Sequence, residues 1–202
     1  MNGYGSGDDA SAVYFNASDL GFGRAMHYKR KVGTDSNFDV AFYVSNFDTV
    51  DHARLGIGPI ATVAMDYALD PAHVSLGRYT KFYVYDAAGN RVDRANLDGG
   101  GDKFVPNLCQ ICHGGNHVAT GNATSGWNLN AKFIPFDMDS YTYSTFSTAK
   151  PSAQHNAFRT MNLGIRDYSG PSTAVSALIT GWYGLSGTGT FNRDFVPTAW
   201  QV

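Results

Sequence analysis

The segment Arg78-Tyr-Thr-Lys-Phe-Tyr-Val-Tyr85, followed by Asp86-Ala-Ala-Gly-Asn90, decides the fold class. Its side chains alternate between two faces, a period of two that is typical of a β-strand. One face carries Tyr79, Lys81, Tyr83 and Tyr85, and the other carries Phe82 and Val84. Because glycine and asparagine tolerate positive φ, residues 86–90 predict a hairpin turn into a short return strand near residues 91–92.

The same alternation recurs upstream, at residues 39–47 and again at residues 60–68. Three alternating segments and a hairpin turn predict a small antiparallel sheet in the first half of the chain. The run Leu97-Asp-Gly-Gly-Gly-Asp102 holds no regular element and predicts a flexible joint after this sheet.

Helices are predicted only beyond this joint. Residues 106–114 indicate one or two helical turns, with Asn107 as N-cap and Gly114 as the stop. Two longer helices are expected to be capped by Ser152 and Ser172. Their apolar stripes are Ala157, Phe158, Met161 and Ile165 in the first helix, and Val175, Leu178, Ile179 and Trp182 in the second.

Strands early and helices late predict an α+β fold, in which an N-terminal antiparallel β lobe precedes a loop-rich helical lobe. We expect residues 1–97 to form the β-rich lobe with a flexible N-terminal tail, and residues 98–202 to form the second lobe or to continue the same domain. A length of 202 residues suits one domain better than two.

Composition excludes several classes of protein. The formal net charge of −2 gives no basic field for neutralising phosphates, so we expect no nucleic-acid partner. The apolar runs at residues 60–64 and 174–179 are far shorter than the about 20 residues that span a bilayer, so no membrane-spanning helix is expected. Two cysteines are too few for a disulfide framework.

Those two cysteines belong to the sequence Cys109-Gln-Ile-Cys112-His113. The pattern Cys-x-x-Cys-His is the attachment signature of a c-type haem. Thiols one helical turn apart reach two vinyl groups on the same porphyrin edge, while the adjacent imidazole is free to bind the iron. The motif therefore predicts one covalently bound haem.

Two other interpretations use the same residues. Cys109 and Cys112 form a local disulfide or a redox-active dithiol in one of them, although no βαβ unit is readable around the motif. In the other, both cysteines bind zinc together with His113 or His117, although paired ligands in structural zinc sites are usually separated by a longer loop.

The chain resembles the c-type cytochromes, through residues 109–113 alone. The resemblance implies thioether bonds from Cys109 and Cys112, His113 as the proximal iron ligand, and electron transfer as the activity. It also implies a location outside the cytoplasm, because haem is attached after export in this family. The first residues lack the apolar segment of a secretory signal, so we expect export to have been directed by a segment not in this chain.

The sixth iron ligand must be a histidine or methionine that folds back onto the haem. The segment Asp19-Leu-Gly-Phe-Gly-Arg-Ala-Met-His27 is the favoured source, because Gly21 and Gly23 permit close backbone approach to a flat ligand. His27 is the predicted distal ligand, and Met26 and Met138 are the alternatives.

The sequence thus indicates a monohaem c-type cytochrome, periplasmic or extracellular, that transfers single electrons to redox partner proteins, alone or as a subunit of a larger redox assembly. An electron carrier is favoured over an enzyme, since no acid–base constellation or nucleophile motif accompanies the haem motif. The alternative is a secreted β-rich binding or structural module with a local disulfide or zinc clip at Cys109 and Cys112.

Overall fold

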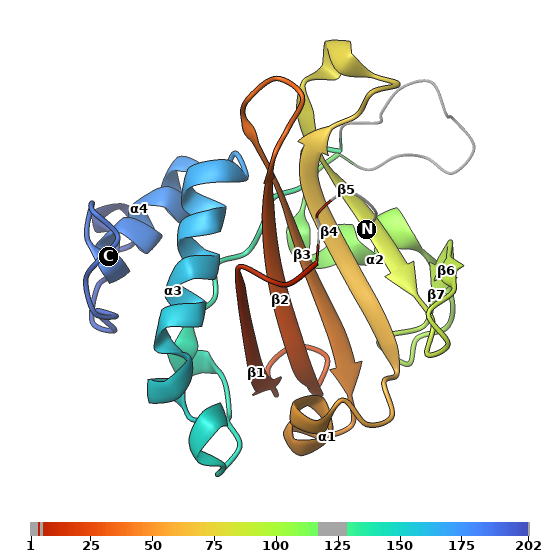
Figure 1. Cartoon of the computed structure of the whole chain (residues 1–202), viewed down its shortest axis with the longest axis horizontal. Coiled ribbons are helices and arrows are strands. Elements are labelled where there is room, and N and C mark those ends of the chain that lie inside the picture. The colour runs from red at the N-terminus through yellow and green to blue at the C-terminus, as the bar shows by residue number, and fades with distance from the viewer. Residues whose placement is uncertain (1–3, 5, 117–128, 202) are drawn as a thin grey trace.

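The computed structural model describes residues 4, 6–116 and 129–201, and it has a mixed α+β fold built on one antiparallel sheet (Figure 1). Within the described residues this sheet has six strands, each hydrogen-bonded to the next in chain order. The strands are β1 (Ala10–Asn16), β2 (Phe22–Val32), β3 (Phe38–Phe47), β4 (Ala61–Leu69), β5 (Arg78–Tyr85) and β6 (Arg91–Val92). The alternating segments and the hairpin turn predicted from the sequence correspond to β3, β4, β5 and β6.

The first two strands were not predicted, and β2 replaces the expected ligand-binding segment. Gly21 lies in the turn that precedes β2, with a φ of 72° that glycine adopts without strain. Gly23 lies within β2, where a Cβ would stand 2.0 Å from the backbone oxygen of Thr49. Gly23 therefore permits close approach of the protein's own backbone and does not face a flat ligand.

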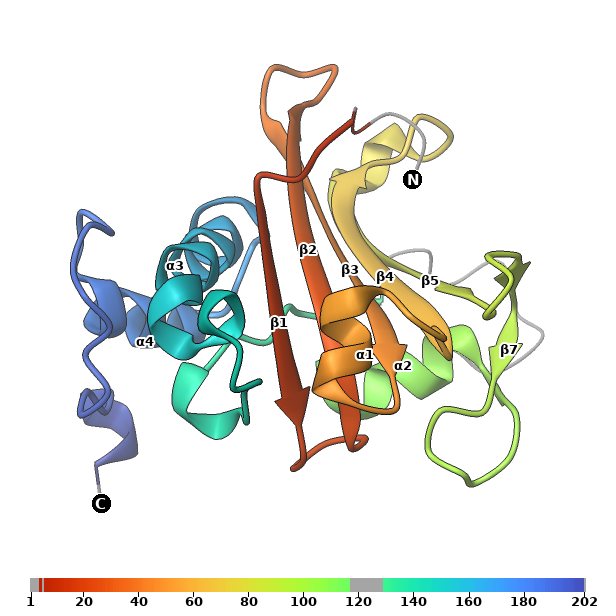
Figure 2. The same cartoon turned by 60° about the horizontal axis from the view of Figure 1, so that its bottom comes forward.

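The helices are α1 (Val50–Leu55), α2 (Val105–His113), α3 (Pro151–Tyr168) and α4 (Thr173–Tyr183), with short 3₁₀ turns at Val74–Leu76, Met138–Ser140, Ser147–Ala149 and Thr198–Trp200. Figure 2 shows α1 in front of the strands and α2 behind them. A two-stranded ribbon of β7 (Arg94–Ala95) and β8 (Lys103–Phe104) leads into α2. Residues 96–102 between β7 and β8 contain no helix or strand, as expected.

Two of the three predicted N-caps are wrong. The first turn of α2 begins at Val105, two residues before Asn107, because a proline with its fixed φ and missing N–H fits a first turn. The same effect starts α3 at Pro151, one residue before Ser152. Ser172 is confirmed, since its side chain accepts a hydrogen bond from the Val175 N–H. Gly114 is confirmed as the residue that ends α2.

The main core lies between the inner face of the sheet and helices α3 and α4. Phe158, Met161 and Ile165 of the predicted stripe are fully buried there. They belong to one hydrophobic cluster with Tyr14 of β1 and Phe42 of β3, so residues from both sides of position 97 share a core. No helix in the described ranges is both long and apolar enough to cross a membrane.

Candidate functional site

A cavity of about 250 Å³ lies between the inner face of the sheet and helix α2. Strand pairing arranges its floor in cross-strand rows, in which Met26, Val44 and Val63 form one row and Phe42, Met65 and Phe82 the next. The segment after residue 129 closes one side with Phe133, Ile134 and Phe136. The cavity is therefore mainly apolar, and its floor is a rigid sheet.

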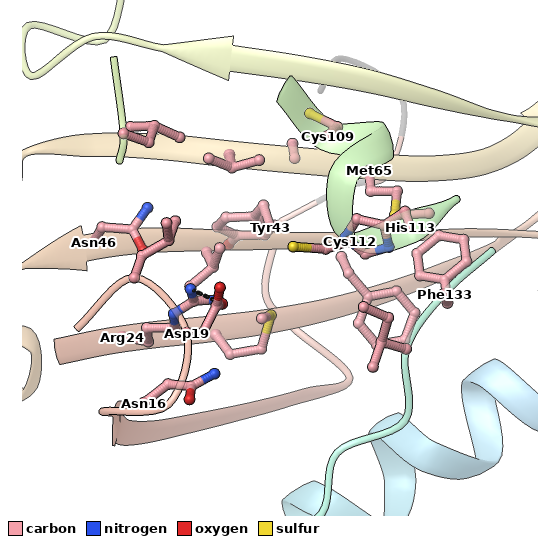
Figure 3. A pocket seen from close by; sticks show the side chains of 18 of the residues that line it. Asn16, Asp19, Arg24, Tyr43, Asn46, Met65, Cys109, Cys112, His113 and Phe133 are labelled. Carbon is pink, nitrogen blue, oxygen red and sulfur yellow. Dashed lines mark hydrogen bonds and ion pairs between the residues drawn. The ribbon is translucent and has the colours of Figure 1, made fainter. Parts of the chain in front are cut away.

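All three chemical residues of the motif line this cavity. Cys109 and Cys112 are three residues apart on α2, close to one helical turn, and both are free thiols. Cys109 is buried against Val84 and Val105, whereas Cys112 is exposed. In Figure 3, His113 lies next to Met65 and Phe133 at one end of the cavity, whereas the Cys112 sulfur points away from them, toward the middle.

Burial controls the protonation of the two thiols. It raises the pKa of Cys109 to about 12, and it also raises the pKa of Cys112. Both residues are therefore thiols at neutral pH. Reactive dithiols and zinc ligands need the thiolate, which a positive neighbour or a metal usually stabilises. No group of three or more histidine, cysteine and acidic side chains placed to hold a metal ion occurs among the residues described.

His113 is held in one orientation and one tautomer. Its Nδ1 lies 2.8 Å from the backbone oxygen of Lys132. A carbonyl oxygen only accepts, so Nδ1 carries the proton and Nε2 of the neutral ring keeps its lone pair. Burial lowers the pKa of His113, which favours this neutral form. A histidine that binds a metal commonly donates its second ring N–H to a carbonyl or carboxylate in the same way.

The segment that holds His113 is itself fixed at both ends. Thr80 of β5 donates from Oγ1 to the backbone oxygen of Ala131, at 2.8 Å. Asn162 of α3 accepts from the Phe136 N–H at 2.8 Å and donates to the Phe136 oxygen at 2.9 Å. Sheet and helix thus position the carbonyl of Lys132 between them.

The structure separates the three predicted distal ligands. His27 does not line the cavity: side chains alternate along β2, so His27 projects from the opposite face of the sheet. There its Nδ1 lies 2.6 Å from Asp8 Oδ2, and its ring stacks on Tyr43 with centroids 4.5 Å apart. Met138 is buried outside the cavity lining. Met26 lines the cavity.

Met65 also lines the cavity, although no sequence motif points to it. It is the register partner of Phe82, whose ring centroid lies 5.7 Å from that of His113. Met65 therefore lies on the side of the cavity where His113 lies. Met26 stands one row further along the sheet and two strands across from Met65, roughly 12 Å away by strand geometry.

The end of the cavity away from the motif is polar. In Figure 3, Asn16, Asp19, Arg24 and Asn46 gather there. Arg24 donates from Nη2 to Asp19 Oδ2 at 2.6 Å. Arg24 and Asn46 are opposite each other in the pairing of β2 with β3, a contact that only the strand register reveals.

Comparisons with protein-family models, with curated proteins and with solved structures found no match for this chain. The site is therefore interpreted from its own geometry. His117, the further zinc ligand considered above, lies outside the described residues.

Proposed function

We propose that this protein is a monohaem c-type cytochrome that transfers single electrons. One observation carries the proposal: Cys109, Cys112 and His113 border a single apolar cavity, and the only nitrogen of His113 free to bind a metal is Nε2. A five-residue motif on its own does not show that its residues border a binding site. A motif that opens onto an apolar cavity fits a flat apolar cofactor.

The donor set of the cavity fits a haem, which supplies one-electron chemistry at its iron when bound. Cys109 and Cys112 would hold the haem by adding across its two vinyl groups, with one S–C bond formed per thiol and the thiol hydrogen taken up by the other vinyl carbon. This addition needs no oxidant. The addition consumes the protonated thiol, which is the form that the raised pKa values favour in both cysteines. His113 would hold the iron through Nε2, and the hydrogen bond to Lys132 would keep its ring from turning.

Met26 is the distal ligand in this proposal, in place of the His27 that the sequence favoured. Among the described residues that line the cavity, Met26 and Met65 are the methionines, and no histidine other than His113 contributes. Met65 lies beside Phe82, on the side of the cavity where His113 lies. Met26 is therefore the methionine that would reach the iron from the side opposite His113. Thioether ligation raises the reduction potential relative to bis-histidine ligation.

Electrons enter and leave, in this proposal, where the cavity reaches the surface. Ile111 of α2 and Ile134 line the cavity and remain 68% and 47% exposed. An apolar rim suits brief contact with a redox partner protein, in the periplasm or outside the cell, whether the chain acts alone or within a larger redox assembly. An electron carrier is favoured over an enzyme because no acid–base constellation or nucleophile motif accompanies the haem motif in the sequence.

The alternative, a secreted binding or structural module with a disulfide or zinc clip at Cys109 and Cys112, has less support. Both cysteines are free thiols with raised pKa values, and neither property favours a thiolate site.

Expression together with a haem-attachment apparatus tests the proposal. The purified protein should be red, show a Soret band, and keep its colour when acid and acetone extract non-covalent haem. The variant Cys109→Ala/Cys112→Ala should lose its colour on extraction, whereas the matched variant Ser172→Ala, far from the cavity, should keep it. A colourless wild-type protein from the same cells contradicts the proposal.

A further inference from the structure

Two buried polar atoms at the far end of the cavity lack partners. Asn46 is 1% exposed, and its Oδ1 accepts no hydrogen bond from the described part of the chain. Arg24 Nε is buried and likewise donates to no described atom. Buried polar groups are almost always paired, so a bound polar group here, a water or part of a ligand, would complete the pairing of both atoms.

The charge at this end is balanced, but the hydrogen bonding of Arg24 is not complete. Arg24 is the only lysine or arginine among the described residues that line the cavity. Asp19 occupies one terminal nitrogen of its guanidinium, 2.6 Å away. The Nε–H remains free, and an arginine readily binds a second carboxylate through another edge.

The two orphan atoms set different requirements. The ligand group must accept from Arg24 Nε–H and must bring a donor to Asn46 Oδ1. A carboxylate with one bound water meets both requirements, because its oxygen accepts from Arg24 and the water donates to Asn46. A purely apolar group leaves both orphans buried and unpaired.

We infer that Arg24 and Asn46 form a carboxylate-binding site that orients the porphyrin before its thioether bonds form. This inference rests on the proposed function. Haem is amphipathic, with its two carboxyl groups on the side of the ring away from the vinyl groups. The cavity is likewise apolar around His113 and Phe133 and polar around Arg24, and the Cys112 sulfur points from α2 toward the space between them (Figure 3).

The neighbouring cations do not share this role. Lys29 lies 3.8 Å from Asp8 and Lys31 lies 3.9 Å from Asp39, both on the opposite face of the sheet from the cavity. Arg30 stacks over Phe38 and does not line the cavity. Arg30 therefore provides a matched control on the same strand as Arg24.

The test separates carboxylate binding from covalent attachment by using the full chain with Cys109→Ala/Cys112→Ala. This variant is titrated with iron protoporphyrin IX and with its dimethyl ester, and binding is followed by the Soret absorbance. We expect Arg24→Met to weaken binding of the free acid about tenfold or more, as the loss of a charge-assisted hydrogen bond does. Arg30→Met should have no effect.

In the chain that keeps Arg24, the dimethyl ester should bind as weakly as the free acid binds to the Arg24→Met variant. The substitution Arg24→Met should not weaken binding of the ester any further. The comparison of acid with ester on the Arg24 chain needs no arginine variant, so the test survives if Arg24→Met does not fold. Equal binding of acid and ester overturns the carboxylate site and leaves the proposed function intact. Failure of both porphyrins to bind contradicts the proposed function itself.

Discussion

His113 donates from Nδ1 to the backbone oxygen of Lys132, 2.8 Å away, and the Lys132 N–H donates back to the His113 oxygen at 3.0 Å. This reciprocal pair joins the end of the motif helix to a residue that is 19 positions further along the chain. It fixes which nitrogen of His113 faces the cavity. The chemistry of the motif thus depends on a contact that is absent from the motif.

Substitution of the distal ligand tests the assignment of Met26. With haem attached, Met26→Leu should shift the low-spin spectrum towards high spin and lower the reduction potential, because the thioether ligand is lost. His27→Ala should leave the spectrum unchanged, because His27 lies on the opposite face of the sheet. An unchanged spectrum in Met26→Leu removes Met26 from the iron, and a shift in His27→Ala restores the sequence prediction.

Removal of the Asn162 side chain tests how the segment beside His113 is held. Asn162→Ala leaves the N–H and the oxygen of Phe136 unpaired in the core, and should lower the free energy of unfolding by about 3 kcal/mol. Denaturant titration measures the loss. Asn107→Ala is the control and should change stability by less than about 0.5 kcal/mol, since Asn107 caps no helix. Equal losses in the two variants contradict this description.

The two serines predicted as N-caps should behave differently. Ser172→Ala removes the hydrogen bond to the Val175 N–H and should cost about 1 kcal/mol of stability. Ser152→Ala removes no cap, because Lys150 holds that position in α3, and should be close to neutral. Thermal unfolding of both variants checks the difference, and the reverse order would show that α3 begins at Ser152.

Acid should weaken the fold through Asp70. Tyr79 O–H, and then His73, hold the pKa of the Asp70 carboxyl below its usual range. A depressed pKa in the folded state stabilises the native protein above the unfolded value of about 4, and this contribution disappears as pH falls through the folded pKa. Asp70→Asn should therefore lower Tm at pH 7 and have a smaller effect at pH 3. An equal loss at both values contradicts the charge-dependent contribution.

The sequence predicted those parts of the fold that depend on local periodicity. The alternation predicted β3, β4 and β5 correctly, although each strand buries residues on both faces, as Ala64 and Met65 show in β4. The stripe of Phe158, Met161 and Ile165 was predictable because α3 packs on the sheet. β2 escaped prediction because Gly23 is unfavourable in a strand. Position 23 requires glycine because the backbone of Thr49, a residue distant in sequence, lies too close to it for a side chain.

The candidate site was predictable only where it is local. Cys109, Cys112 and His113 are adjacent in sequence, whereas Met65 and Asn46 reach the cavity through strand register. Met26 and His27 are neighbours in β2, so their side chains project from opposite faces of the sheet. The choice between them depended on which of the two faces the cavity. Nothing in the sequence of β2 fixed that phase before its pairing with β3 was known.

The intact mass of the purified protein, expressed with a haem-attachment apparatus and measured under denaturing conditions, tests the central claim most directly. We expect the mass of the chain plus one haem, and the mass of the bare chain for Cys109→Ala/Cys112→Ala. A wild-type mass equal to the bare chain, or lower by two hydrogens as a disulfide requires, would contradict it.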